Sequence, residues 1–195
     1  MSQEYSDNID EPGDSSQKVW GFLKDILQIV FFALILTFFL RTYVIEARLI
    51  PSESMLPTLE IGDRLLVDKI VFKFRELERT DIVVFAPPPE AQRGAGDDDL
   101  IKRVVGLPGD TVEVKESRVF VNNKPLDEPY IAERLNYTYG PVAIPEGYLF
   151  VMGDNRNYSF DSHAWGFLPL ENLKGRAFFR FWPLDRFGLI DGVKS

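Results

Sequence analysis

The feature that most constrains this chain of 195 residues is the apolar stretch over residues 20–40 (WGFLKDILQIVFFALILTFFL). Because an α-helix rises ~1.5 Å per residue, this stretch as a helix would be about 30 Å long, close to the thickness of the hydrocarbon core of a bilayer. Lys24 lies near its N-terminal end, where a long side chain can bring its ammonium group to the lipid headgroups. The stretch therefore predicts one transmembrane helix over residues 20–40.

Two other interpretations of the stretch were weighed against this one. Its strictly apolar part begins only at Ile26 and contains Gln28 and Thr37, which is also compatible with a buried helix of a soluble protein. A cleaved signal peptide needs a basic segment before it and a small-residue cleavage site after it, whereas residues 1–19 are acidic and Arg41 follows the stretch. A retained signal anchor therefore fits better. Its orientation does not follow from charge, because basic residues flank both ends.

The remaining residues divide into a tail and a domain, residues 1–19 and 41–195. The tail is polar, with five acidic residues against Lys18, and it holds half of the formal net charge of −8, so we expect it to be disordered. Neither part contains a basic patch, which argues against a nucleic-acid partner. The chain has no cysteine, which excludes disulfide bonds and thiolate sites.

Beyond residue 44 the pattern changes to short segments that are rich in β-branched and aromatic residues and often alternate with polar ones. Turn signals separate them, among them Glu116-Ser117, Asn122-Asn123 and Gly140-Pro141, and residues 111–121 are typical of a tight β-hairpin. Residues 86–99 lack apolar periodicity and are expected to form a long exposed loop. We predict a mainly β, mostly antiparallel domain with strands at residues 65–67, 82–86, 101–105, 111–115, 118–121, 148–152 and 177–182.

Four segments are dense in glycine, proline, aspartate and serine, which shape the loops where functional groups are often placed. They are residues 50–59 (IPSESMLPTL), 62–69 (GDRLLVDK), 102–110 (KRVVGLPGD) and 153–169 (GDNRNYSFDSHAWGFLP). A serine hydroxyl is a weak nucleophile that needs an adjacent base. The single histidine, His163, lies four residues after Ser159 and two after Asp161, so a serine–histidine–aspartate triad is one candidate.

A lysine base is the other candidate, because a desolvated lysine keeps part of its amine neutral near pH 7. Lys102 is flanked by apolar residues in a strand-like run that is able to bury it. A fall of roughly 2 units from a reference pKa of ~10.4 corresponds to about 2.7 kcal/mol, which burial can supply. The residue pattern alone favours a plainer interpretation, in which Lys102 and Arg103 alternate on an edge strand and Lys102 faces solvent.

Taken together, the four segments resemble the type I signal peptidases, the serine–lysine enzymes that remove signal peptides from exported preproteins. The resemblance rests on P-S-x-S-M-x-P-T-L, G-D, K-R-V-V-G-L-P-G-D and G-D-N-R-N-x-S-x-D-S, in the order of the family. It extends from the apolar stretch to about Trp182 and looks most like cyanobacterial or plastid members. It implies a catalytic domain built as an antiparallel β-sheet or partial barrel, preceded by one transmembrane helix.

The resemblance also implies roles for individual residues. Ser54 is similar to the family nucleophile and Lys102 to its general base, while the Ser52 hydroxyl and the Ser54 N–H would form the oxyanion hole. Ser159 matches the serine that hydrogen-bonds the base amine and orients it. Asp161 and Arg103 occupy positions that the family uses to hold this neighbourhood together. The positions that line shallow pockets for small substrate residues are Ile50, Pro51, Met55, Leu65 and Ile101.

Three positions depart from the family pattern. Glu53 replaces a small residue between the two serines, which puts a carboxylate near the oxyanion hole. Phe160 stands where a small residue is frequent, and we expect it to narrow the floor of the first pocket. His163 takes a place often held by an arginine, which weakens the expected ion pair with Asp161 but allows a hydrogen bond.

The resemblance thus implies a membrane-anchored serine endopeptidase that cuts preproteins after a small residue, at sites of the Ala-x-Ala type. Its partners would be preproteins with signal peptides and the lipid bilayer of a plasma or thylakoid membrane, with a single-pass anchor and the catalytic domain on the exported side. The substrate would bind extended, beside strands of the domain.

No metal or cofactor is expected. Residues 154–165 superficially suggest a calcium loop, but Ser159 stands where glycine is required and Trp165 where a bidentate glutamate belongs. Two other functions were considered. A self-cleaving serine–lysine regulator would be soluble and would carry a DNA-binding domain, whereas this chain has an apolar anchor. An inactive homologue that only binds peptides would have no use for the serines and the lysine together.

Overall fold

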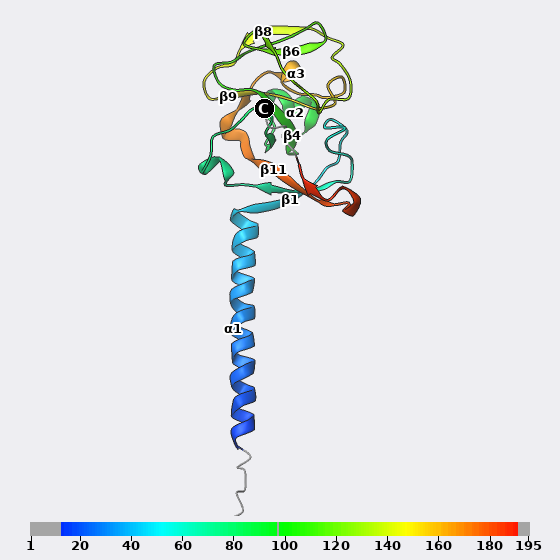
Figure 1. Cartoon of the computed structure of the whole chain (residues 1–195). Coiled ribbons are helices and arrows are strands. Elements are labelled where there is room, and N and C mark those ends of the chain that lie inside the picture. Colours follow the sequence, from blue (N-terminus) through cyan, green and yellow to red (C-terminus); the bar gives the residue numbers. More distant parts are fainter. Residues whose placement is uncertain (1–12, 97, 191–195) are drawn as a thin grey trace, which may run out of the picture. The chain divides into compact units, whose positions relative to one another are not determined.

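The structure is a computed structural model that describes residues 13–96 and 98–190. Its contacts divide the chain into two units, one that ends at Thr42 and one that begins at Tyr43. Helix α1, Gly13–Tyr43, lies in the first unit except for its last residue (Figure 1). The segment Val19–Val44 is long and apolar enough to cross a membrane, by length and composition, with a mean hydropathy of 2.1. The predicted apolar helix is therefore confirmed.

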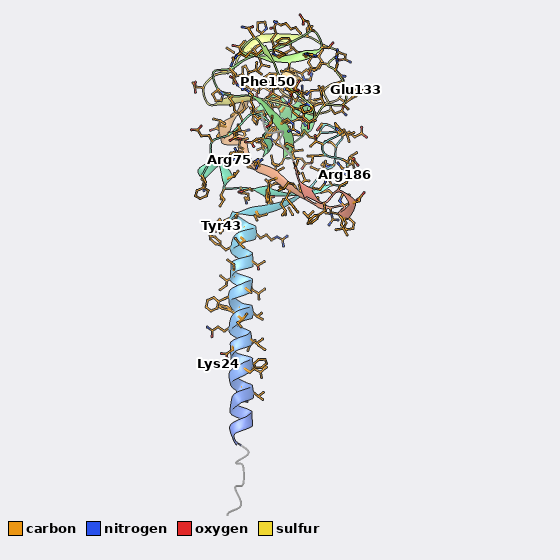
Figure 2. All side chains as sticks on the ribbon, in the orientation of Figure 1. Lys24, Tyr43, Arg75, Glu133, Phe150 and Arg186 are labelled. Atoms are coloured by element: carbon orange, nitrogen blue, oxygen red, sulfur yellow. The ribbon has the colours of Figure 1, made fainter. Side chains whose placement is uncertain are left out.

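Helix α1 begins at Gly13, earlier than the predicted start at residue 20. Residues 13–19, which we assigned to the tail, are therefore helical. Once a helix exists, each further residue adds a hydrogen bond at little conformational cost, so extension past the apolar stretch is favourable. The rest of the expected tail, residues 1–12, lies outside the described residues. Figure 2 labels Lys24 on this helix and Tyr43 at its last residue.

The second unit, which we call the β domain, contains an eight-stranded sheet in which every pair of neighbours is antiparallel. The strand order is β1-β2-β11-β3-β4-β9-β10, and β12 pairs with β11. The strands are β1 Ile45–Leu49, β2 Arg64–Asp68, β3 Ile82–Phe85, β4 Leu100–Gly106, β9 Tyr148–Met152, β10 Leu168–Pro169, β11 Leu173–Trp182 and β12 Gly188–Leu189. The predicted mainly β, antiparallel fold is confirmed.

A smaller antiparallel sheet has the order β7-β6-β5-β8, and Figure 1 shows β6 and β8 at the end of the β domain away from β1. Its strands are β5 Thr111–Lys115, β6 Arg118–Val121, β7 Lys124–Pro125 and β8 Tyr139–Ala143. The predicted hairpin is present, with Lys115 opposite Arg118. The turn residues Glu116 and Ser117 have φ of 51° and 59°, the left-handed pair typical of a two-residue turn that matches strand twist.

Two expectations about loops are wrong. Residues 86–99 contain helix α2, Pro89–Ala95, because a proline suits the first helical position and Gly96, at φ 71°, ends the helix. The Gly140-Pro141 pair lies inside β8 instead of forming a turn. Because β8 is an edge strand of the small sheet, Pro141 can lack an N–H without breaking a ladder. The remaining short elements are α3 Ser162–Trp165, η1 Val71–Lys73, η2 Leu170–Asn172 and η3 Leu184–Arg186.

Strand β4 is the element that positions the site. It lies between β3 and β9 in the large sheet, so it is an interior strand. Ile101 belongs to one buried cluster and Val104 to another, so both faces of β4 are covered. Lys102 is 3% exposed and Arg103 0% exposed. The interpretation of β4 as an edge strand with Lys102 facing solvent is therefore wrong.

Candidate active site

Ser54 and Lys102 lie next to each other although 48 residues separate them in the chain. Ser54 is in the turn-rich segment between β1 and β2, and Lys102 is the third residue of β4. The Lys102 Nζ donates to Ser54 Oγ at 2.8 Å and to the Ile101 carbonyl at 3.0 Å. Ser54 is 9% exposed, so the pair is almost enclosed but still reaches the surface. This is the distance at which a base can take a proton from a hydroxyl.

Burial shifts the protonation of Lys102. Loss of hydration penalises the charged ammonium and lowers the pKa of Lys102 to about 8, while the nearby carboxylates of Asp161 and Asp154 act in the opposite direction. Desolvation is the larger effect. About one amine in ten is then neutral at pH 7, far more than at the ordinary pKa of a lysine. The strand that buries Lys102 thus leaves part of its amine neutral, and able to accept a proton, near neutral pH.

The turn around Ser54 leaves two donors near its hydroxyl. Ser52 Oγ lies 3.3 Å from Ser54 Oγ, and Ser52 is exposed. Within the described part of the chain, the Ser54 N–H takes part in no hydrogen bond. The Ser54 carbonyl, in contrast, accepts from the Asn155 N–H at 3.1 Å. The backbone is therefore fixed on its carbonyl side and has an unused N–H on the other, as an oxyanion site requires.

The partner of Arg103 is Asp154. The guanidinium donates from Nε and Nη2 to the two carboxylate oxygens of Asp154, at 2.7 and 2.6 Å, and from Nη1 to the Thr80 carbonyl at 3.0 Å. The ring of Tyr130 lies 3.9 Å from the guanidinium carbon. Arg103 and Asp154 are both fully buried, so the pair is fixed in place directly beside Lys102 in the chain. Arg103 thus ties β4 to Asp154, at the start of the loop after β9.

Asp161 instead anchors the loop after β9. Its carboxylate accepts from the Gly153 N–H at 2.9 Å, and it caps α3 by accepting from the His163 N–H at 3.2 Å. The His163 ring Nδ1 lies 2.7 Å from the same carboxylate and stacks on Tyr137 with ring centroids 4.5 Å apart. The hydrogen bond allowed for His163 is present. No hydrogen bond joins His163 to Ser159 among the described residues, so the histidine triad is not assembled.

Ser159 is placed close to the pair but is not bonded to it. Its hydroxyl is buried and has no hydrogen-bond partner in the described part of the chain. The expected bond to Lys102 is therefore not formed here, and the Lys102 amine donates to Ser54 Oγ and to the Ile101 carbonyl. A Cβ at Gly153 would overlap both Ser159 Oγ and the Ser54 carbonyl oxygen. The glycine thus allows the two serine-bearing loops to pack within contact of each other.

The expected pocket residues separate into core and surface. One buried cluster contains Ile50, Met55, Leu65 and Ile101, while Pro51 is exposed. Met55 and Leu65 have no exposed surface, so they form the floor beneath the serine turn and not its open wall.

Phe160 was expected to narrow the first pocket. Its ring lies against α2, where a Cβ at Gly94 would come within 2.7 Å of it.

Comparison with known proteins identifies the family of this chain. Residues 23–182 match the family described as "Signal peptidase, peptidase S26". The chain belongs to this family. Probable signal peptidase I-2 of Synechocystis sp. is 54% identical over 158 residues, covering 81% of this chain and 72% of that protein. Signal peptidase I of Leptolyngbya laminosa is 46% identical over 180 residues, covering 91% and 89%.

The similar proteins also include one from a plant. Probable thylakoidal processing peptidase 2 of Arabidopsis thaliana is 42% identical over 183 residues, which cover 92% of this chain but only 50% of that protein. The resemblance to type I signal peptidases of cyanobacterial and plastid kind is thus confirmed.

Sequence reasoning missed three residues of this signal peptidase site. Asp154 is the carboxylate that binds Arg103, Thr58 donates to that carboxylate, and Tyr130 covers the guanidinium. Asp154 and Thr58 both lie inside segments that the motifs had marked, so a search for the acid opposite Arg103 would have reached them. Tyr130 lies in the unmarked loop between β7 and β8, and nothing in the sequence pointed to it.

Proposed function

We propose that this chain is a signal peptidase I that cleaves preproteins by a Ser54–Lys102 dyad. The observation that carries the proposal is the 2.8 Å contact between Lys102 Nζ and Ser54 Oγ, made by a lysine whose burial lowers its pKa to about 8. A buried lysine without an acidic partner is costly to a fold and needs a chemical reason. Lys102 makes no ion pair within the described residues, and its amine is directed at a hydroxyl.

The proposed reaction is acyl transfer. Neutral Lys102 takes the Ser54 proton as Ser54 Oγ attacks the carbonyl carbon of the residue before the cleavage point. The tetrahedral intermediate collapses with transfer of that proton to the leaving amine, which becomes the N-terminus of the mature protein. An ester between Ser54 and the signal peptide remains. Lys102 then takes a proton from water, which attacks the ester, and the released Ser54 oxygen regains the proton.

The negative oxygen of both intermediates needs donors. The unused N–H of Ser54 and the hydroxyl of Ser52 are the two proposed ones, and the loss of one such donor typically costs about 3–4 kcal/mol of transition-state stabilisation. Ser159 is proposed to turn its free hydroxyl to the Lys102 amine during turnover. Asp161 and Arg103, through Gly153 and Asp154, would hold the loops that carry these groups.

The substrate is proposed to be a preprotein cut after a small residue at an Ala-x-Ala type site, with Ile50, Pro51, Met55, Leu65 and Ile101 around the residues before the cut. Helix α1 would be a single-pass anchor in a plasma or thylakoid membrane, with the β domain on the exported side, where cleavage sites emerge. An anchored enzyme meets membrane-tethered substrates at a high effective concentration, so the helix would contribute to catalysis.

The test is cleavage of a preprotein with an Ala-x-Ala site by the purified full chain in detergent, with the cut mapped by mass spectrometry. Ser54→Ala and Lys102→Ala should each abolish measurable cleavage, and His163→Ala should leave most of it. Full cleavage by either of the first two variants would disprove the dyad. Loss of most turnover in His163→Ala would support the histidine triad instead.

A further inference from the structure

A hollow of about 400 Å³ opens beside the turn that carries Ser54. Three separate segments line it, namely the Ser54 turn, the loop between β7 and β8, and the loop after β9. We call it the acidic hollow, and the lining residues that matter here are Glu53, Leu56, Glu60, Glu133, Asn155 and Tyr158. Figure 2 labels Glu133, at the outer side of the β domain. The hollow is a surface feature outside the catalytic machinery described above.

The acidic hollow is joined to the nucleophile through the backbone. Glu53 directly precedes Ser54. The Asn155 N–H donates to the Ser54 carbonyl at 3.1 Å, and the Asn155 side-chain amide donates to the Glu53 carbonyl, also at 3.1 Å. The wall of the hollow is therefore fixed within one residue of the attacking oxygen. Any peptide bond that reaches Ser54 Oγ has chain on both sides, so one side of the substrate must pass near the hollow.

The hollow lies apart from the groups proposed for the signal-peptide side of the substrate. Ile50, Met55, Leu65 and Ile101 belong to one core cluster, and none of them lines the hollow. The hollow is therefore available to the substrate residues that follow the cleavage point. We propose that the acidic hollow binds the first residues of the mature protein and favours a lysine or arginine there.

The charges of the hollow support this assignment. Three of its residues are glutamates, all exposed, and no lysine or arginine lines it. Glu60 is paired with Arg186, at 2.9 Å. Glu53 and Glu133 make no ion pair with any described residue, and Glu133 only accepts from the Asn157 amide at 3.3 Å. A mobile cation of the substrate would thus meet two carboxylates that the fold leaves without a counter-ion.

The apolar part of the wall suits the same occupant. Leu56 is half-buried, and Tyr158 is 74% exposed. A lysine or arginine can lay its aliphatic stem against such surfaces while its charged end stays near the carboxylates. An aromatic ring also attracts a cation placed over its face. A glutamate in the same place would meet like charge, and a short neutral side chain would reach neither carboxylate.

This inference rests on the proposed function, because a subsite beside Ser54 has meaning only if Ser54 attacks the substrate. The test uses the full chain in detergent and a set of peptides that share one Ala-x-Ala site. Each peptide carries lysine, glutamine or glutamate at one of the three positions after the cut and is otherwise unchanged. At the best position we expect kcat/KM to be roughly 2- to 5-fold higher for lysine than for glutamine, as for exposed charge pairs, and lower again for glutamate. The preference should weaken in 0.5 M salt, where screening is stronger.

Variants of the hollow locate the effect. Glu133→Gln, far in sequence from the nucleophile, should reduce the lysine preference about 2-fold, and Glu53→Gln should do likewise. Glu146→Gln is the matched control, because Glu146 is exposed, carries the same charge and does not line the hollow. An equal loss of preference in Glu146→Gln, or a charge preference confined to residues before the cut, would overturn the inference.

Failure of the inference and failure of the proposed function give different results. If the wild type cuts the lysine, glutamine and glutamate peptides equally well while Ser54→Ala cuts none, the subsite is wrong and the dyad stands. If Ser54→Ala cuts the glutamine peptide as well as the wild type does, the proposed function is wrong and the subsite falls with it.

Discussion

The pH dependence of cleavage is a direct test of Lys102 as the base. Burial lowers the pKa of Lys102 from 10.5 to about 8. At ~1.36 kcal/mol per unit, this shift corresponds to about 3 kcal/mol of preference for the neutral amine. In the proposed reaction the neutral amine accepts the Ser54 proton, so cleavage activity should rise with pH. About one amine in ten is neutral at pH 7 and about nine in ten at pH 9, whereas at an unshifted pKa only ~1 in 3,000 would be neutral at pH 7.

The assay is kcat/KM for a peptide with an Ala-x-Ala site, measured with the full chain in detergent from pH 6 to pH 9.5. Below pH 7 we expect a tenfold rise per pH unit, then a plateau above about pH 8.5. The value at pH 9 should be about ten times the value at pH 7, because kcat/KM reports the ionisation of the free enzyme.

Two variants show which group titrates. His163→Gln should keep the midpoint near pH 8. Asp161→Asn should move it to lower pH, because the Asp161 carboxylate raises the pKa of Lys102 and its removal disfavours the charged amine. A flat profile between pH 6 and 9 would refute the reasoning from burial. A midpoint near 6.5 that disappears in His163→Gln would assign the base to the histidine instead.

Three further substitutions test the packing around the dyad. Lys102→Met should raise the free energy of unfolding at pH 7 by about 1–3 kcal/mol, measured by urea denaturation. The reason is that a lysine whose pKa is lower in the folded than in the unfolded state opposes folding at every pH under 8. This gain in stability should shrink between pH 8 and 10.5, where the lysine loses its charge in both states. Ser159→Ala should leave the free energy of unfolding unchanged or raise it by up to ~1 kcal/mol, since its buried hydroxyl has no partner, yet it should lower kcat at least tenfold. A fall in unfolding free energy with unchanged kcat would contradict that role. Gly153→Ala should lower kcat/KM at least 100-fold and lower the free energy of unfolding by about 2 kcal/mol in thermal denaturation, because its Cβ would overlap both serine-bearing loops. Near-normal activity of this variant would show that the two loops are less tightly packed than described.

The strands that could be predicted are those with a buried face. Seven segments with β-branched or aromatic alternation became strands, among them β4, β5 and β9, because alternation reflects one side that is removed from water. Strand β1, Ile45–Leu49, was missed because it is an edge strand with an alternating half-exposed pattern and contains Glu46 and Arg48. Its only ladder is with β2, so its strand geometry comes from backbone pairing that leaves little trace in composition.

The sequence motifs pointed to the members of the candidate site but not to the contacts between them. The motifs pointed to Ser54 and Lys102, and the structure brings both to one point. That Asp154 is the partner of Arg103 depends on how the loop after β9 folds back across β4. That path is set by the Asp161 hydrogen bonds to the Gly153 and His163 N–H groups, which no spacing rule contains. Sequence reasoning therefore stops at the question of which acidic residue of this loop pairs with Arg103.

The partners of the two acids explain why the pKa of Lys102 is lowered, as the proposed base requires. Asp154 and Asp161 both favour the charged ammonium, and two unneutralised carboxylates so close would hold the amine protonated. The Asp154 carboxylate, however, is occupied by the charge and two N–H donors of Arg103, and Asp161 by two N–H groups and the His163 ring. Because both carboxylates are bound to other groups, desolvation outweighs them and the pKa of Lys102 falls. In the proposed reaction Arg103 would act through Asp154, because without the positive charge of Arg103 the Asp154 carboxylate would favour the protonated amine of Lys102.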